Sequence, residues 1–280
     1  MTPEMMVHLK NDGLNIAVAG GRLYVRCMRS MFSYDTVNMT ETAHEVVFKK
    51  DGKARGFSLF GDFVYLTDFC DLYILAKDRL QVLDVYRLGG DLTSDLGAVR
   101  FDATNAYIGV RNGKMAVMDM CTHDACMYSV TDSSFWDFCV LGNCIYAGTV
   151  HGELVAIDTE DMQVVKKASL GKKNIYSVVP YGKFLYAVSQ DMTIKAIDID
   201  TLEVAFQAKK AVGGMARILG VDGERLLIAD SNKVSVWDVH TLGHQDTIAF
   251  PTGSYNKGIV LSGGILYGSD LQGIYRMMLV

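Results

Sequence analysis

The residues best suited to chemistry are two thiols and an imidazole that lie close together in the chain. Cys121, His123 and Cys126 carry the sulfur and nitrogen donors that bind Zn²⁺ tetrahedrally. The segment has no fourth ligand, and its spacing differs from that of the common zinc motifs. We therefore expect an ordinary loop with no metal ion, and a zinc site is the alternative.

Three further side chains have both a chemical and a structural interpretation. Cys139 and Cys144 flank a Gly-Asn turn, where a disulfide is geometrically conceivable. Without a signal-peptide pattern, two packed thiols are the favoured interpretation. His151 lies in a turn, where an imidazole can transfer protons. No carboxylate occupies a partnering position near it in the repeat, which favours a solvated side chain.

The remaining search finds no catalytic or cofactor motif. The segment from Asp198 to Asp200 begins like an EF-hand loop, but the required glycine and terminal glutamate do not follow it. A P-loop, a dinucleotide fingerprint, His-Glu-x-x-His and a nucleophile elbow are all absent from the sequence. We therefore predict no catalytic residues, no cofactor and no metal.

Tyrosine recurs along the chain at a nearly constant spacing, with leucine in its place once. These anchor residues are Tyr24, Tyr65, Tyr107, Tyr146, Tyr186, Leu227 and Tyr267. A glycine stands four residues before each anchor except Tyr107, where Ala103 replaces it. A period of about 40 residues with short strands is typical of a β-propeller, in which each repeat forms one four-stranded blade.

Residues 136–170 illustrate how one repeat is expected to fold. The apolar run 138–141 predicts an innermost strand, and Gly-Asn at 142–143 predicts a hairpin turn. Residues 144–148 and 154–158 predict the second and third strands, the third ending in an aspartate. Residues 162–166 alternate in polarity, as expected of an exposed outer strand.

The second repeat departs from this pattern. In most repeats an aspartate ends the third strand at a nearly fixed distance from the anchor, as Asp158 does after Tyr146. Asp84, however, lies much further along the chain from its anchor, Tyr65. This spacing predicts a seven-residue excess around residues 69–78, in a longer loop or a lengthened hairpin.

The two ends of the chain are expected to complete one blade. The last repeat stops at Val280 after three strands, and residues 5–9 form an apolar segment before the first innermost strand. Pairing them closes the ring and removes exposed sheet edges. We therefore predict an all-β fold: a seven-bladed β-propeller of four-stranded antiparallel blades, a single domain over residues 1–280, closed by an N-terminal strand.

Composition narrows the environment and the partners. Half of the 280 residues are hydrophobic, which is ample for a core shared between blades. The net charge of −5 argues against nucleic-acid binding, which needs excess basic groups. The chain has no secretory leader pattern and no apolar run of about 18 residues. With six cysteines interpreted as reduced thiols, we expect a cytoplasmic protein without a membrane partner.

The blade pattern over residues 4–280 resembles that of WD40 and quinoprotein-like β-propellers. Residues 236–238, Val-Trp-Asp, look like the WD40 strand ending, as do the Ile-Asp pairs that end at 158 and 198. The Gly-His pair typical of WD40 blades occurs once, at 243–244, and in a different place. The resemblance implies the propeller fold and little about function, because propellers serve as enzymes, sensors and scaffolds.

The repeats also predict two faces of opposite charge. One, the channel-mouth face, carries the loops that lead into the innermost strands and the turns between second and third strands. Ten residues before the anchors stand Leu14, Arg55, Gly97, Trp136, Tyr176, Arg217 and Lys257. Nearby loops add Arg29, Arg111, His151, Lys172 and Lys173. The opposite face collects Asp62, Asp102, Asp222, Glu224, Glu160, Asp161, Asp200 and Glu203.

These observations favour a non-enzymatic interaction module or scaffold whose channel-mouth face binds a protein or an acidic peptide. Arginine and tryptophan are over-represented at interface hot spots. The candidate binding residues are Arg55, Trp136, Tyr176, Arg217, Lys257, Arg29, Arg111 and His151. The alternatives are a propeller enzyme of the hydrolase or lyase type, a small-molecule binder with its site over the central channel, a structural subunit, and loop charges that are merely solvated.

Overall fold

The computed structural model describes residues 3–8, 15–48, 56–88, 96–230, 233–250, 258–270 and 272–279. Seven four-stranded antiparallel sheets, or blades, account for the strands of these residues. Blade 1 comprises β2 (Asn15–Ala19), β3 (Arg22–Arg26), β4 (Ser30–Asp35) and β5 (Glu41–Val46). Blade 2 comprises β6 (Phe57–Phe60), β7 (Phe63–Asp68), β8 (Asp71–Ala76) and β9 (Val82–Arg87). Blade 3 comprises β10 (Leu96–Phe101), β11 (Asn105–Val110), the 3₁₀ turn η1 (Arg111–Gly113), β12 (Lys114–Asp119) and β13 (Ala125–Ser129).

The other four blades repeat the same order. Blade 4 comprises β14 (Phe135–Leu141), β15 (Cys144–Thr149), β16 (Glu153–Asp158) and β17 (Val164–Ser169). Blade 5 comprises β18 (Ile175–Tyr181), β19 (Phe184–Ser189), β20 (Ile194–Asp198) and β21 (Val204–Ala208). Blade 6 comprises β22 (Arg217–Asp222), β23 (Arg225–Asp230), β24 (Lys233–Asp238) and β25 (His244–Ala249). Blade 7 comprises β26 (Ile259–Ser262), β27 (Ile265–Ser269), β28 (Gly273–Met278) and β1 (Glu4–His8).

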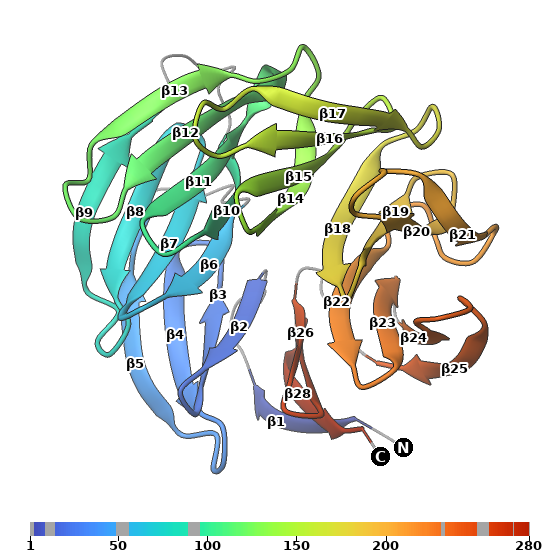
Figure 1. Cartoon of the computed structure of the whole chain (residues 1–280). Helices are drawn as coiled ribbons and strands as arrows, with labels where there is room; N and C mark the ends of the chain where they lie inside the picture. The colour runs from blue at the N-terminus through green and yellow to red at the C-terminus, as the bar shows by residue number, and fades with distance from the viewer. Residues whose placement is uncertain are drawn as a thin grey trace.

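The blades form a closed ring. Each innermost strand lies beside the innermost strand of the next blade, and β26 of blade 7 lies beside β2 of blade 1. Figure 1 shows this circular order, from blue blade 1 to red blade 7. The seven innermost strands therefore surround one axis, and the face that carries the loops leading into them is the channel-mouth face. The predicted seven-bladed fold is confirmed.

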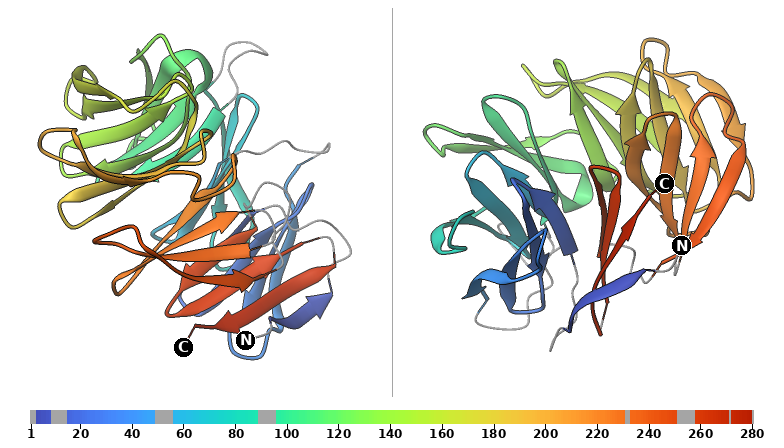
Figure 2. Two further views of the ribbon diagram at one scale, coloured as in Figure 1. Left: turned by 90° about the vertical axis from the view of Figure 1, so that its right-hand side faces the viewer. Right: turned by 90° about the horizontal axis from the view of Figure 1, so that it is seen from below.

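The predicted N-terminal closure is also present. Strand β1 pairs antiparallel with β28, with Glu4 opposite Arg276 and His8 opposite Gly273. Figure 2 shows β1 lying along the edge of the C-terminal blade. The guanidinium of Arg276 lies 3.7 Å from the Glu4 carboxylate and reinforces this pairing. The strand covers residues 5–8 of the expected segment, and residue 9 lies outside the described residues.

The recurring tyrosines and glycines have clear structural roles. Every anchor lies on the second strand of its blade, and the six tyrosines are between 0% and 7% exposed. The six glycines four residues before anchors lie in the turns between first and second strands, with φ between 53° and 61°. Glycine adopts this left-handed conformation without the Cβ clash of other residues, so the turn selects it.

The aspartates that end the third strands stabilise the turns that follow them. The Oδ1 atom of Asp35 accepts the backbone N–H groups of Val37 and Asn38, and Asp119 and Asp198 make equivalent bonds. These backbone bonds hold the pKa values of the three carboxyls below their usual range. The fourth residue after the strand has positive φ in six blades: Met39, Leu80, His123, Met162, Leu202 and Leu242.

The predicted excess in the second repeat is wrong. Strand β8 begins at Asp71, directly after β7, and ends at Ala76, as far from Tyr65 as Asp35 is from Tyr24. Alanine therefore stands where five other repeats carry the strand-ending aspartate, and Asp84 lies on the outer strand β9. Leu80 still adopts φ of 59° and is fully buried, so the turn keeps its shape without the carboxylate.

In the part of the chain that the structure describes, helical structure is confined to the three residues of η1. Those residues include no helix of the length and apolar character needed to cross a membrane.

Candidate functional site

Two aromatic side chains meet at the channel mouth. The registers of β14 and β18 shift between Phe135 and Asp137 and between Ile175 and Ser177. Trp136 and Tyr176 lie within these shifts, and such bulges re-aim side chains. Their ring centroids are 6.1 Å apart with an interplanar angle of 48°. Trp136 keeps 45% of its surface exposed, so the pair presents apolar area to solvent.

Arg217 occupies a different position from these aromatics. The register of β22 shifts later, between Ile218 and Gly220, which leaves Arg217 paired opposite Ala229. Ala229 lies two residues after the blade's anchor. Asp137 lies opposite Gly148 and Ser177 lies opposite Val188. These two partners are likewise two residues after the anchors of their blades. Counting from the anchor therefore misplaces Arg217 by one position, because counting does not reveal where a bulge lies.

Asp137 links three neighbouring blades near the axis. The Nη2 atom of Arg100 donates to Asp137 Oδ1 at 2.5 Å, and Ser177 Oγ donates to Asp137 Oδ2 at 3.2 Å. The side chain of Asp137 is 13% exposed and that of Arg100 is 33% exposed. Both oxygens of the carboxylate are therefore engaged, and blades 3, 4 and 5 are joined by one charged group.

Arg217 belongs to the same group of charges. Desolvation lowers the pKa of its guanidinium, and the charge of Asp137 opposes this shift while that of Arg100 adds to it. Blade 5 lies between blades 4 and 6, and the registers place Arg217 at the same level as Asp137 and Ser177 on the innermost strands. We call Arg100, Asp137, Ser177 and Arg217 the channel cluster. Of these four residues, only Arg217 was predicted from the sequence. Asp137 and Ser177 occupy the same position in the repeat, nine residues before their anchors, and this shared position is the signal that could have identified them.

The remaining predicted residues are distributed around the same face. Arg29 lies in the β3–β4 turn, Arg111 in η1 and His151 in the β15–β16 turn, and all three are exposed. The loops that lead into β18 and β22 add exposed Lys172, Lys173, Lys209 and Lys210. Leu14, Arg55 and Lys257 lie outside the described residues. In the loops of this face that are described, the acidic residues are Asp132, Asp191 and Asp270.

The opposite face carries the predicted acidic residues in its turns. Asp62, Asp102 and Glu224 lie between first and second strands, and Glu160, Asp161, Asp200 and Glu203 lie between third and fourth strands. Asp222 ends β22 and accepts a 2.5 Å hydrogen bond from Arg225 Nη2. The described loops of the two faces thus differ in the sign of their charge.

The side chains considered for metal binding or a disulfide have separate local surroundings. His123 Nδ1 lies 2.7 Å from the Tyr86 hydroxyl, while Cys121 and Cys126 are exposed. Within the described ranges, no three His, Cys, Asp or Glu side chains are placed to hold one metal ion. Cys139 and Cys144 are free thiols, and burial raises the pKa of Cys139 to about 12, which makes it a poor nucleophile.

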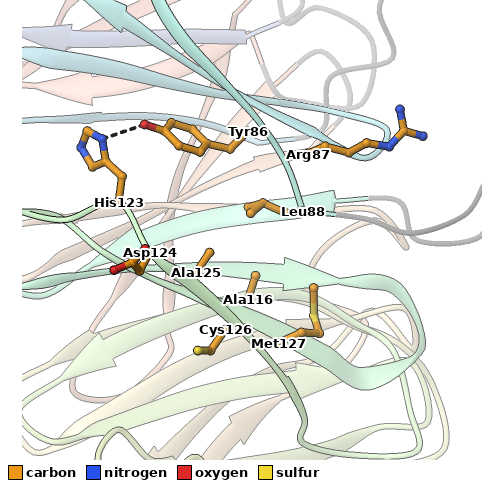
Figure 3. A pocket seen from close by; sticks show the side chains of 9 residues that line it. All are labelled: Tyr86, Arg87, Leu88, Ala116, His123, Asp124, Ala125, Cys126 and Met127. Atoms are coloured by element: carbon orange, nitrogen blue, oxygen red, sulfur yellow. Dashed lines mark hydrogen bonds between the residues drawn. The ribbon is translucent and has the colours of Figure 1, made fainter.

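A groove of about 290 Å³ lies between blades 2 and 3, lined by Tyr86, Leu88, Ala116, His123, Ala125 and Met127 among others (Figure 3). Small side chains create it. Ala116 occupies the third-strand position opposite the residue that follows the anchor. The other blades carry Phe32, Tyr73, Val155, Lys195, Ser235 and Tyr275 at this position. Ala125 occupies the outer-strand position at which five other blades carry Glu41, Val82, Val164, Val204 and His244. His123 also replaces the buried Met or Leu of the other five turns. The groove is a local packing difference on the side of the ring, away from the channel mouth.

Comparison with known proteins identifies the fold. No family profile matches the sequence, and the curated proteins contain no match. A chain of the Mitotic Checkpoint Complex superposes with a TM-score of 0.82 at 12% sequence identity. The superposition covers 99% of this chain and 92% of that chain.

Two other solved structures agree. The Cps50 (Swd1) β-propeller domain of Myceliophteria thermophila has a TM-score of 0.78 at 11% identity, covering 99% of this chain and 100% of its own. The computationally designed Ika8 protein has a TM-score of 0.69 at 11% identity, with 99% and 98% coverage. Identities this low establish the fold alone: this chain is a seven-bladed β-propeller.

Proposed function

We propose that this propeller is a non-enzymatic interaction module that binds an acidic segment of a partner protein on its channel-mouth face. The observation that carries the proposal is the solvent-accessible pair of Trp136 and Tyr176, which directly precede Asp137 and Ser177 of the channel cluster in the chain. Exposed aromatic side chains on a rigid scaffold supply large apolar contact area at low entropic cost.

The charge of the surrounding loops indicates the sign of the partner. Lys172 and Lys173 lie in the loop that leads into β18 and Tyr176, and Lys209 and Lys210 lie in the next such loop, which leads into β22, so four exposed cations belong to the same face as the aromatic pair. Cations on one face and carboxylates on the other orient an acidic partner during approach. Arg29, Arg111 and His151 extend this surface, and Arg55 and Lys257 are proposed to contribute from outside the described residues.

Two considerations favour binding over catalysis. In the described channel cluster the single carboxylate has both oxygens hydrogen-bonded, which leaves it poorly placed as a general base. One of the structurally similar chains comes from the Mitotic Checkpoint Complex. That similarity supports a scaffold role here only by analogy of fold. Six free thiols agree with a cytoplasmic location.

Selection from a displayed random-peptide library tests the proposal. Peptides enriched on the wild-type protein should be rich in Asp and Glu, with an apolar residue that packs on Trp136. Trp136→Ala should weaken their binding by about 1–2 kcal/mol or more, as expected of a hot spot. Tyr181→Ala is the matched control, because Tyr181 is an exposed aromatic residue at the far end of β18.

Two results would contradict the proposal. One is the enrichment of neutral or basic peptides. The other is equal loss of binding in Trp136→Ala and Tyr181→Ala, which would place the interface elsewhere.

A further inference from the structure

The channel cluster carries more positive than negative charge. Arg100 and Arg217 contribute two guanidinium groups, and Asp137 is the single carboxylate with which both interact. Asp137 is already bonded to Arg100 and Ser177. One positive charge therefore remains uncompensated among the described residues of this cluster.

The two arginines differ in their bonding. Arg100 donates to Asp137 and, through Nη1, to the carbonyl of Val99 at 2.9 Å. Its guanidinium also lies 5.9 Å from the centre of the Phe138 ring. For Arg217, no described group accepts a hydrogen bond from the guanidinium, and its interactions with Asp137 and Arg100 are electrostatic only. Its planar array of N–H donors is therefore available to an acceptor from outside the chain.

The surroundings strengthen any such interaction. Arg217 is only partly exposed, and protein surrounds its guanidinium closely enough to desolvate it. Charge-assisted hydrogen bonds are stronger in such partly desolvated sites than in open solvent. The site also lies one register position below Trp136 and Tyr176, on the inward side of the mouth.

We infer that the channel cluster is an anion receptor in which Arg217 binds one carboxylate of an acidic side chain inserted through the channel mouth. This inference rests on the proposed function for the identity of the partner. A guanidinium binds a carboxylate through two parallel N–H···O bonds, which fixes its orientation. One added negative charge makes the cluster neutral.

The negative charge of Asp137 sets the expected selectivity. A monoanionic carboxylate balances the cluster, whereas a dianionic phosphate monoester brings one further charge close to Asp137. Repulsion between like charges then disfavours the phosphate. The receptor is therefore expected to prefer a carboxylate to a phosphate, although both are anions that arginine binds.

Quenching of tryptophan fluorescence by iodide, relative to neutral acrylamide, measures the local concentration of anions. Trp136 is the accessible tryptophan at 45% exposure, and Trp237 is 7% exposed. Arg217→Gln should lower the ratio of iodide to acrylamide quenching constants about two-fold, since it removes one nearby charge. Asp137→Asn should raise the same ratio. The double variant Lys172→Gln, Lys173→Gln is the control for loop charges and should change it less than Arg217→Gln.

Sodium acetate and inorganic phosphate, added at equal ionic strength, distinguish the two anions. Acetate should relieve iodide quenching in the wild-type protein and lose this effect in Arg217→Gln. An unchanged quenching ratio in Arg217→Gln, or a lower ratio in Asp137→Asn, would overturn the receptor. Stronger relief by phosphate would overturn the preference for carboxylate. If peptides still bind Arg217→Gln and fail to bind Trp136→Ala, the interaction face stands and the channel receptor is wrong.

Discussion

Replacement of Tyr186 tests the inference that the anchor tyrosines hold adjacent blades together. Its side chain is 1% exposed and belongs to a buried apolar cluster of blades 5 and 6 that includes Ile194, Ile218 and Leu242. Its hydroxyl donates a 2.6 Å hydrogen bond to the carbonyl of Val239 in blade 6. The single side chain therefore contributes both apolar packing and a buried polar contact across one blade junction.

The two contributions are separated by two variants. Tyr186→Phe removes the hydrogen bond and leaves the Val239 carbonyl without this donor, which should cost about 1–2 kcal/mol. Tyr186→Ala also removes the ring and leaves a cavity, so its total cost should be about 3–5 kcal/mol. Tyr181→Ala, at an exposed position of the same blade, should cost less than about 1 kcal/mol.

Urea denaturation followed by circular dichroism measures these free energies of unfolding. The midpoint should fall in the order wild type, Tyr186→Phe, Tyr186→Ala. Burial also raises the pKa of Tyr186 to about 12. Its neutral form thus stabilises the fold fully below pH of about 10, and this contribution is lost as pH rises through about 12. Tyr186→Phe should reduce that alkaline loss. Tolerance of Tyr186→Ala within about 1 kcal/mol would refute the inferred role.

Three further outcomes are expected. Deletion of residues 1–12 removes β1 and exposes the edge of β28, so it should lower the melting temperature by about 5 °C or more. An unchanged melting temperature would refute the closure of the ring by β1. Asp191→Ala should destabilise the fold by about 2 kcal/mol, because it removes the carboxylate that lies 3.7 Å from the buried Lys195 ammonium. Lys195→Met should change the free energy of unfolding by less than about 1 kcal/mol, and the reverse order in urea denaturation would contradict this account. His123→Leu should fill the groove between blades 2 and 3 and raise the melting temperature, since Leu80, Leu202 and Leu242 occupy the same turn position in their blades. A marked fall in the melting temperature would instead assign a structural role to the hydrogen bond between Tyr86 and His123.

Much of the fold could be predicted from the sequence because each repeat obeys the same local rules. Glycine marks the first turn through its positive φ, and tyrosine marks the second strand through burial between blades. The rule fails where a different residue meets the same requirement. Ala76 ends β8 without the usual aspartate, so spacing from Asp84 wrongly predicted extra residues.

The candidate site was only partly predictable. Trp136 and Tyr176 share one column of the repeat and do meet in space. Arg217 shares that column in sequence but not in register, because the bulge of β22 lies further along the strand. The bonds that join Arg100, Asp137 and Ser177 connect three blades. Such contacts depend on how blades pack around the axis, and no spacing within one repeat encodes them.

Titration of a selected acidic peptide over a range of ionic strength tests the central claim most directly. Wild-type affinity should fall as salt rises from about 50 to 500 mM, because exposed charges become screened. The double variant Trp136→Ala, Arg217→Gln should bind at least about ten-fold more weakly at low salt while keeping its melting temperature. Binding that is independent of salt and unchanged in the folded double variant would contradict the assignment of the channel-mouth face as the binding surface.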